Sequence, residues 1–428
     1  MRMLNRKTFV AVGALAIAGS TVASTGVAFA DSAAPEQFDV VGVGSDTVQN
    51  VIDFILDGGP GDPSAYNGSG ANRVYSFFAT GDVNGRLLYD GTCGTKDAGT
   101  GLGLLCDHTA TPQAANAVSS SAILRAGTKP VVRPNGSGAG VKALIADAPG
   151  GAGYQGLPLG SIQFARMSRL PNPTGGEYDA CLGTSTCGGL NVYQIATDTL
   201  TMAVSNISGK TYVGPALSAN QLVHIYQCDS GYTHFNDAAV GGSSSDTIDP
   251  LIPQSGSGTR TFFLAQLQAA NGGTAITLGS CVRTVQEHDP TGIYGDANPQ
   301  DAIEPFSSGK LHLINTGYFT NGAGYSGTLG NAFTPNQLTL MTGTPSDSNP
   351  LFSTSRGMYI VVRHADLAST TKFQPGGTKN WANTLIAGGA SSVFRSATYA
   401  AAYTLAGLTQ SFVDCQTAAS VTTNPPTC

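Results

Sequence analysis

The sequence predicts an α/β fold, because strand-like apolar runs alternate with amphipathic helices along the chain. Residues 38–44 form a short apolar run, and apolar residues then recur at helical spacing from position 48 to position 56. A second amphipathic helix is expected over residues 217–226. Residues 358–362 form a continuous apolar run that is typical of a buried strand in a parallel sheet. No tandem repeat of fixed period is present, which excludes solenoids and propellers.

The size and composition of the chain indicate a folded protein with two domains. A chain of 428 residues is too long for one ordinary hydrophobic core. Hydrophobic residues make up 41% of the sequence, which excludes wholesale disorder. Only 11% of the residues are charged, whereas 56 are glycine, so we expect a loop-rich surface of uncharged polar side chains.

The first thirty residues are expected to be a secretory signal peptide. Arg2, Arg6 and Lys7 precede an apolar run at 9–17, and Ala-Phe-Ala at 28–30 supplies a cleavage site of small residues. The apolar run is too short to span a membrane, and no cysteine follows the cleavage site to carry a lipid anchor. We therefore expect a secreted, extracellular protein that does not span the membrane.

The net charge argues against nucleic acid and anionic membranes as general partners. The formal charge of −6 becomes −9 once the three basic residues of the signal peptide are removed. A small anion can still be held by neutral N–H and O–H dipoles, because a distant net charge is screened by salt.

The cysteines predict four disulfides. The chain holds an even number, and an exported protein is oxidised. Sequential pairing is the simplest of the possible connectivities. The spacing required for a zinc site of these cysteines is absent from the sequence, and no metal or cofactor is expected. The eight positions are Cys93, Cys106, Cys181, Cys187, Cys228, Cys281, Cys415 and Cys428.

The predicted elements follow from these patterns and from helix caps. Ser45 or Asp46 is expected to cap the first helix, and Gly58 with Gly59 ends it. The stretch at about 60–131 is rich in Gly, Asn, Asp and Thr, and is expected to be a surface insertion stapled by a Cys93–Cys106 disulfide. In order, we predict a strand at 38–44, a helix at 45–58, the insertion, a helix after residue 140, a strand end at 162–169, a strand at 191–204, helices at 217–226 and after residue 258, a strand at 358–362 and a helix at 397–405.

Three turns rich in Gly and Ser precede predicted helices, at 44–47, 135–140 and 255–259. Glycine lets the backbone approach a ligand, the hydroxyls donate hydrogen bonds, and the first N–H groups of a helix have no partner within the helix. Each turn alone is also compatible with an ordinary helix cap. Together they indicate an anion site.

Four stretches resemble, in the same order, the ligand loops of the phosphate-binding proteins of ABC-type phosphate uptake systems. They lie at 44–49, 135–142, 167–169 and 255–260, and the helix expected at 217–226 resembles one in the second lobe of that family. The resemblance implies a two-lobed type II periplasmic-binding-protein fold with a hinge, to which this chain adds the Gly-rich insertion. Lobe I would comprise residues 31–198 and 355–428, and lobe II residues 199–354.

The resemblance also implies a ligand, partners and a set of binding residues. The ligand would be inorganic phosphate or a related tetrahedral oxyanion, the partner an ABC permease, and the protein a monomer without catalytic residues. Closure of the lobes would bury the anion for uptake or sensing. By position, the binding residues would be Asp46, Thr47, Ser137, Ser168, Arg169, Ser255, Ser257, Gly258, Thr259 and Arg260.

Three positions differ from the pattern of that family. Pro253 stands where many members have an arginine, so Arg260 or Arg169 would have to supply the positive charge. Asp46 stands where Thr or Ser is usual, and some members have an Asp at the position of Arg169. We therefore hypothesise that Asp46 accepts the proton of hydrogen phosphate and so discriminates against sulfate, although an N-cap role is also compatible with an Asp there.

Two other classes of function are also compatible with the sequence. One is a surface interaction protein that keeps the fold without the ligand, which the insertion and Pro253 favour. The other is a secreted serine hydrolase, although neither Gly256-Ser257-Gly258 nor Gly136-Ser137-Gly138 has the glycine two residues before the serine that a nucleophile elbow requires. The six histidines, including His288, show no triad spacing, and each is expected to be a surface or capping residue.

Overall fold

The computed structural model describes residues 35–59, 65–67, 73–79, 121–173, 175–181, 187–318, 335–368, 380–415 and 428. The predicted signal peptide, Cys93, Cys106 and most of the predicted insertion lie outside these ranges. Within them, none of the helices combines the length and the apolar character needed to cross a membrane.

The described chain alternates strands and helices, as the sequence predicts. The strands are β1 (Val40–Gly44), β2 (Val74–Ser76), β3 (Ser121–Ala122), β4 (Val131–Val132), β5 (Phe164–Met167), β6 (Leu190–Ile207), β7 (Lys210–Thr211), β8 (Asp249–Pro253), β9 (Arg283–Val285), β10 (Ala302–Ser307), β11 (Leu338–Leu340), β12 (Ser353–Arg363) and β13 (Thr409–Asp414). The helices are α1 (Asp46–Asp57), α2 (Ser137–Ala146), α3 (Tyr178–Cys181), α4 (Ala219–Gln227), α5 (Gly258–Ala270), α6 (Thr291–Tyr294), α7 (Ser308–Asn315) and α8 (Ala400–Leu405).

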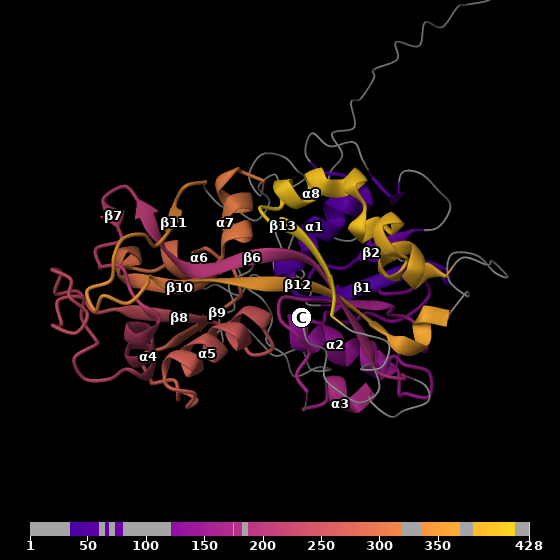
Figure 1. Ribbon diagram of the computed structural model, residues 1–428, viewed down its shortest axis with the longest axis horizontal. Helices are drawn as coiled ribbons and strands as arrows, with labels where there is room; N and C mark the ends of the chain where they lie inside the picture. Colours follow the sequence, from indigo (N-terminus) through magenta and orange to yellow (C-terminus); the bar gives the residue numbers. More distant parts are fainter. Residues whose placement is uncertain are drawn as a thin grey trace, which may run out of the picture.

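One mixed sheet of 11 strands runs through the molecule, in the order β2-β1-β5-β12-β6-β10-β8-β9, with β7, β11 and β13 also paired to β6. Strands β2, β1 and β5 are parallel to one another, and so are β10, β8 and β9. The two parallel groups are joined by antiparallel pairing of β5 with β12, β12 with β6, and β6 with β10. The long strands β6 and β12 cross from one half of the molecule to the other (Figure 1).

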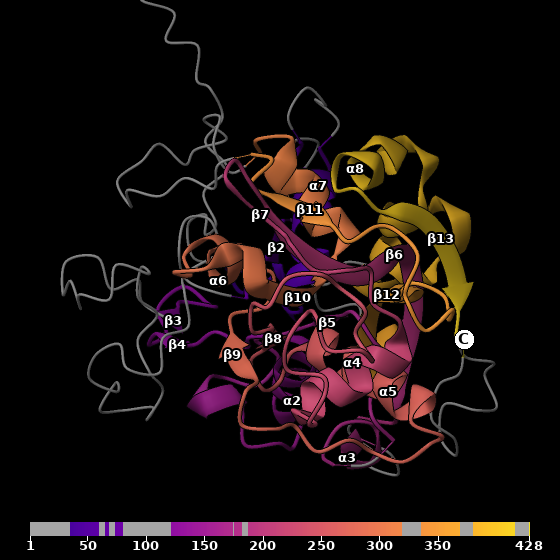
Figure 2. The same ribbon diagram turned by 90° about the vertical axis from the view of Figure 1, so that its left-hand side faces the viewer.

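Helices cover both faces of this sheet. Helices α1, α6, α7 and α8 lie on one face, and α2, α3, α4 and α5 lie on the other (Figures 1 and 2). On the α1 face a single hydrophobic cluster extends over both halves, from Ile52 of α1 to Leu311 of α7 and Tyr403 of α8. On the opposite face the core is divided into two clusters, one under α2 and one under α4 and α5. The two halves are therefore packed together on one face and separable on the other.

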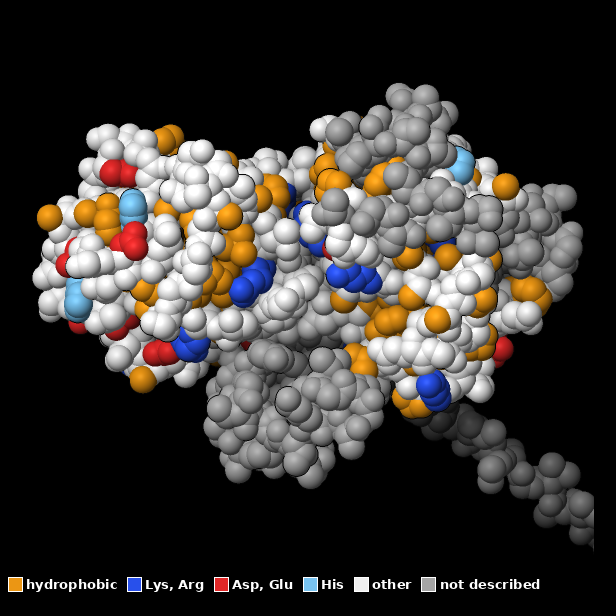
Figure 3. Space-filling model, turned by 90° about the horizontal axis from the view of Figure 1, so that it is seen from below, with side chains coloured by type: hydrophobic (Ala, Val, Ile, Leu, Met, Phe, Trp, Pro, Cys, Tyr) orange, Lys and Arg blue, Asp and Glu red, His pale blue; other side chains and the backbone are white. Residues whose placement is uncertain are grey.

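The face that carries α2, α4 and α5 is the one seen from below in Figure 3. Uncharged polar and hydrophobic side chains dominate it, and charged side chains are scattered (Figure 3). This surface agrees with the low charged fraction of the sequence.

The structure corrects four local predictions. The apolar run at 358–362 is a buried part of β12, but β12 pairs antiparallel with both of its neighbours, because an apolar run reports burial and not direction. Val74 lies in β2 and is fully buried, so this part of the predicted surface insertion belongs to the sheet. Ser45 occupies the N-cap position of α1, as predicted, but its side chain makes no capping hydrogen bond. Helix α8 begins only at Ala400, after a short 3-10 turn.

Three of the four predicted disulfides lie in the described residues, and all three have the sequential pairing: Cys181–Cys187, Cys228–Cys281 and Cys415–Cys428. The Cys228–Cys281 bond ties the end of α4 to the strand β9 region across 53 residues of sequence. It therefore closes a loop that contains β8 and α5.

We expect the Cys228–Cys281 disulfide to stabilise the fold more than the Cys181–Cys187 disulfide. The two bonds close loops of 53 and 6 residues, and loop-closure entropy predicts contributions of about 4 and about 2 kcal/mol respectively. Urea unfolding of Cys228→Ser/Cys281→Ser and of Cys181→Ser/Cys187→Ser measures the difference. Equal losses in the two variants would contradict it.

Candidate functional site

The carboxyl ends of the parallel strands meet at the centre of the molecule, where the starts of three helices approach one another. Gly138 at the start of α2 donates its N–H to the carbonyl of Gly256, 3.3 Å away, just before α5. A Cβ on Gly136 would lie 2.4 Å from that carbonyl, and a Cβ on Gly140 would lie 2.5 Å from Gly44 Cα, just before α1. Glycine is therefore required at these turns, because a side chain would separate the three helix starts.

Buried hydroxyls line this meeting point. Ser137 Oγ lies 3.3 Å from Ser168 Oγ and accepts the Ser168 N–H at 3.0 Å. One hydroxyl hydrogen is used between these two oxygens, which leaves the other available to a ligand. A Cβ on Gly258, the first residue of α5, would lie 2.2 Å from both oxygens. The two serines from one half thus touch the start of α5 from the other half.

The start of α5 is also occupied by an internal carboxylate. Glu287, which follows β9, accepts the Thr259 N–H at 3.2 Å and is fully buried. Ser257 caps the helix by accepting the Arg260 N–H at 3.0 Å. A negative charge is favourable at a helix N-terminus, so Glu287 occupies a position where an anion would also be stabilised.

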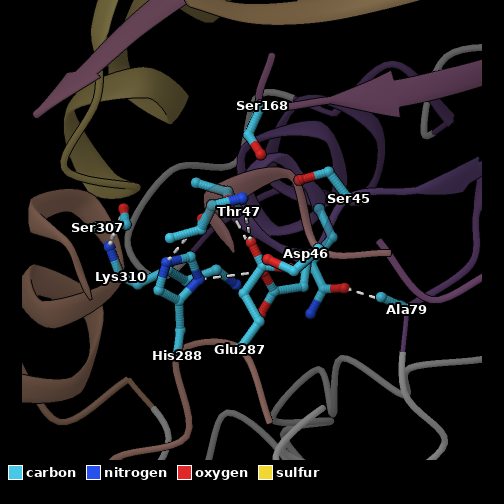
Figure 4. Close-up of polar contacts among 12 residues, drawn as sticks. Ser45, Asp46, Thr47, Ala79, Ser168, Glu287, His288, Ser307 and Lys310 are labelled. Carbon is cyan, nitrogen blue, oxygen red and sulfur yellow. Dashed lines mark hydrogen bonds and ion pairs between the residues drawn. The ribbon is translucent and has the colours of Figure 1, made fainter. Parts of the chain in front are cut away.

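A chain of contacts links α1 to α5 through His288. His288 Nδ1 lies 3.1 Å from Asp46 Oδ1, and His288 Nε2 lies 3.3 Å from Thr259 Oγ1. All three residues are fully buried, and Figure 4 shows Asp46, Glu287 and His288 directed toward one another. His288 has a φ of 56°, which is uncommon outside glycine and indicates that packing holds it in place.

A buried ion pair lies behind Thr259. Arg356 of β12 and Asp198 of β6 are directly paired in the ladder, and Arg356 Nη2 lies 2.9 Å from Asp198 Oδ2. Arg356 also donates from Nη1 to Thr259 Oγ1 at 2.7 Å. Asp198 Oδ1 accepts the Gly309 N–H at 3.2 Å, at the start of α7. The pair therefore connects the two central strands to the starts of α5 and α7.

A second group of buried charges fixes the turn between β1 and α1. Arg166 donates to the carbonyls of Gly44 and Ser45 at 3.2 and 3.1 Å. Burial raises the pKa of Asp53 on α1 well above its usual range, and the nearby guanidinium of Arg166 and ammonium of Lys310 offset part of the rise. Burial also lowers the pKa of Arg166 to about 10. These contacts hold the start of α1 against the end of β5.

Most of the residues predicted to bind a ligand meet at this site. The side chains or backbones of Asp46, Thr47, Ser137, Ser168, Ser257, Gly258 and Thr259 are all buried there. Ser255 is exposed. Its position places it on the outer side of the turn.

The two arginines predicted to supply positive charge each have a partner within the protein, and Arg169 lies beside the start of α2, because its Nη2 would be 3.1 Å from a Cβ on Gly138. Arg169 makes a two-point ion pair with Glu177, at 2.8 and 2.7 Å. Arg260 is partly buried, donates to the carbonyl of Pro253 at 2.8 Å, and has its pKa lowered by burial. Arg356 is a buried arginine that contacts the site through Thr259.

Four residues of the site were not predicted from the sequence: Asp198, Glu287, His288 and Arg356. The expectation that His288 is a surface or capping residue is wrong, because its side chain is fully buried between α1 and α5. Asp198 and Arg356 lie within strands, and a charged residue inside a buried strand was an available signal. Glu287 and His288 follow a short strand with no flanking motif.

The arrangement of these residues is also compatible with two chemical roles other than anion binding. Asp46, Glu287 and His288 each offer a ligand atom, all within 4.8 Å of one another, so they could hold a metal ion. The contacts from Asp46 to His288 and from His288 to Thr259 also match the order of an acid–histidine–hydroxyl catalytic triad. The Thr259 hydroxyl is buried and also accepts a hydrogen bond from Arg356, which leaves its own hydrogen to donate to His288 or to a ligand.

Comparisons with known proteins give fold-level likenesses only. No protein-family model and no curated protein matches the chain. A solved ABC-type phosphate transport receptor from Vibrio cholerae is 14% identical, with a TM-score of 0.42, over 87% of this chain and 100% of that one. A putative phosphate ABC transporter substrate-binding protein from Clostridium perfringens, solved with bound phosphate, is 14% identical, with a TM-score of 0.45, over 87% and 99%. Because the sequence identities and TM-scores are this low, the function has to be inferred from the geometry of this chain.

We expect Arg356→Met to lower the free energy of unfolding by about 3–5 kcal/mol, because it leaves Asp198 buried without its partner. The double variant Arg356→Met/Asp198→Leu should recover most of this loss, since both charges are then removed. Chemical denaturation measures all three proteins.

Arg283→Met is the matched control for this test. The Arg283 side chain is 42% exposed and pairs with Asp249 and Asp296 at 2.6 and 2.7 Å. Surface pairs contribute about 1 kcal/mol or less. If Arg356→Met costs no more than Arg283→Met, the buried pair does not hold the site together.

Proposed function

We propose that this protein binds a small tetrahedral oxyanion, with inorganic phosphate as the first candidate, where α1, α2 and α5 begin. The observation that carries the proposal is the meeting of buried hydroxyls from both halves at these helix starts, with Ser137 and Ser168 on one side and Thr259 on the other. Hydroxyls and helix N-termini are the donors that bind phosphate in proteins.

The predicted lobe boundaries place these donors on opposite sides of the site. Asp46, Ser137 and Ser168 belong to the proposed lobe I, and Thr259 and His288 to the proposed lobe II. The contacts between them are hydrogen bonds, such as Gly138 to Gly256 and His288 to Asp46. On this face the hydrophobic core is divided. We propose that bending of β6 and β12 separates the lobes here, admits the anion and closes over it.

The buried carboxylates support an anion that carries a proton. Asp46, Asp198 and Glu287 are all fully or almost fully buried at the site, against Arg356 and His288. These carboxylates would repel an anion that carries no proton. Hydrogen phosphate can instead donate a hydrogen bond from its proton to a carboxylate. We propose Asp46 as this acceptor. Export from the cell, delivery to an ABC permease and a monomeric state remain proposals that follow from the sequence.

Phosphate binding should depend on the buried hydroxyls and not on the exposed one. We expect Ser137→Ala, Ser168→Ala and Thr259→Val each to weaken phosphate binding by about 10–100-fold, because each removes a hydrogen bond to a charged ligand. Isothermal titration in a buffer with chelator measures the affinity. Ser255→Ala is the control, and its affinity should equal that of the wild type.

Two outcomes would contradict this proposal. One is the absence of binding or of thermal stabilisation by phosphate at millimolar concentration. The other is hydrolysis of a chromogenic ester that is lost in Thr259→Val, which would favour the relay of Asp46, His288 and Thr259 as a catalytic unit.

The preference for phosphate over sulfate should depend on Asp46. Sulfate has no proton to donate at neutral pH, so we expect wild-type protein to bind it at least about 10-fold more weakly. Asp46→Asn removes the negative charge while keeping the size of the side chain. The ratio of phosphate affinity to sulfate affinity should therefore fall toward one. Asp229→Asn, on the surface, is the control. An unchanged ratio in Asp46→Asn would show that another group selects the anion.

A further inference from the structure

We propose that Asp46, Glu287 and His288 form a binding site for one divalent transition-metal ion. Asp46 is the first residue of α1, and Glu287 and His288 follow β9 in the other half of the molecule. Their ligand atoms lie within 4.8 Å of one another, and all three side chains are fully buried. Figure 4 shows the two carboxylates and the imidazole around a common centre.

Glu287 supplies an observation that is independent of the clustering. Its Oε1 accepts the Thr259 N–H, but its Oε2 has no hydrogen-bond partner among the residues that the structure describes, although it is shielded from solvent. An ionised carboxylate oxygen that is buried without a partner is strongly unfavourable. A cation bound to Oε2 would satisfy it.

The spacing of the ligand atoms fits a first-row metal ion. Bonds of about 2.1 Å in tetrahedral geometry hold two ligand atoms about 3.4 Å apart. Asp46 Oδ1 and His288 Nδ1 are already 3.1 Å apart, and the group as a whole spans at most 4.8 Å. A small contraction of the group would therefore bring three ligand atoms to bonding distance, and a water molecule would supply the fourth ligand of a tetrahedral ion.

The identity of the ligands selects the class of metal. An imidazole nitrogen with two carboxylates suits zinc and similar transition metals, whereas magnesium and calcium prefer oxygen ligands alone. The metal would bind His288 Nδ1, so the ring would carry its proton on Nε2. That N–H would donate to Thr259 Oγ1, 3.3 Å away, and so orient the ring as outer contacts do for metal-bound histidines.

The metal site shares Asp46 with the proposed oxyanion site but does not require a bound anion. It requires only Asp46, Glu287 and His288, and its ligand is a cation. A metal ion would also place a positive charge between the two carboxylates of Asp46 and Glu287.

Zinc titration of purified, tag-free protein tests the proposal. Metal is first removed with chelator, and zinc chloride is then added in a buffer without phosphate, with isothermal titration and thermal melting as readouts. Wild-type protein should bind one zinc ion tightly and melt at a higher temperature with zinc. Loss of a residue that only contacts a metal ligand weakens metal binding by about 10–100-fold. Glu287→Gln and Asp46→Asn each change a ligand itself, so each should weaken zinc binding at least as much.

His224→Gln is the matched control, because His224 lies 2.7 Å from Asp229 in a pair of the same chemistry whose side chains are 44% and 43% exposed. It should leave the tight zinc site intact. Melting in chelator shows whether each variant folds. Glu287→Gln keeps an oxygen to accept the Thr259 N–H, so the variant is expected to fold. If a variant does not fold, X-ray absorption of zinc-loaded wild type decides, with one imidazole and oxygen ligands expected.

The metal proposal is overturned if wild-type protein binds no zinc, or if folded Glu287→Gln and Asp46→Asn bind zinc as tightly as the wild type. It is also overturned if only His224→Gln loses zinc binding, or if the absorption spectrum shows sulfur or several imidazoles as ligands. Phosphate titration in chelator separates the two proposals. Zinc binding without phosphate binding overturns the proposed function alone, and phosphate binding without zinc binding overturns the metal site alone.

Discussion

The buried ion pair between Asp198 and Arg356 is the constraint on which the centre of this structure depends. The two residues face each other in the ladder of β6 and β12, the strands that cross between the two halves. Neither charge can be buried alone, so each must be paired and hydrogen-bonded at the same time. Besides pairing with Arg356, Asp198 accepts a hydrogen bond from the backbone at the start of α7. Arg356 in turn donates a hydrogen bond to Thr259 at the start of α5. The position of α5 relative to the central strands is thereby set by electrostatics as well as by packing.

The glycine turns and the buried charges were not equally predictable from the sequence. Helices that follow Gly/Ser turns are local features, so α1, α2 and α5 and their first residues could be located from the pattern. Ser137, Ser168 and Thr259 converge because the two parallel groups of strands run in opposite directions and direct their carboxyl ends toward each other. The pairing of β12 was predicted as parallel and is antiparallel, because a continuous apolar run shows burial on both faces but carries no directional information.

The charged residues of the site were missed because their partners are distant in the sequence. Arg356 is 158 positions from Asp198, and His288 is 242 positions from Asp46. An isolated His or Glu in a polar run gives no periodic signal, so only the folded structure shows that it is buried. The arginines that the sequence did offer, Arg169 and Arg260, lie near the site but satisfy Glu177 and a backbone carbonyl. Their role in binding a ligand stays a prediction.

The two proposed ligands make different demands on the same closed arrangement. A single atom at the Cβ position of Gly258 would already lie 2.2 Å from two serine oxygens, so that side of the site has no room for the oxygens of a tetrahedral anion. An oxyanion therefore requires the helix starts to separate, which is possible on the face where the core is divided. A metal ion at Asp46, Glu287 and His288 requires only a small contraction, since their ligand atoms already lie within 4.8 Å. The cation would stabilise the closed arrangement by cross-linking α1 to the segment after β9, whereas the anion would stabilise it only after opening and re-closure.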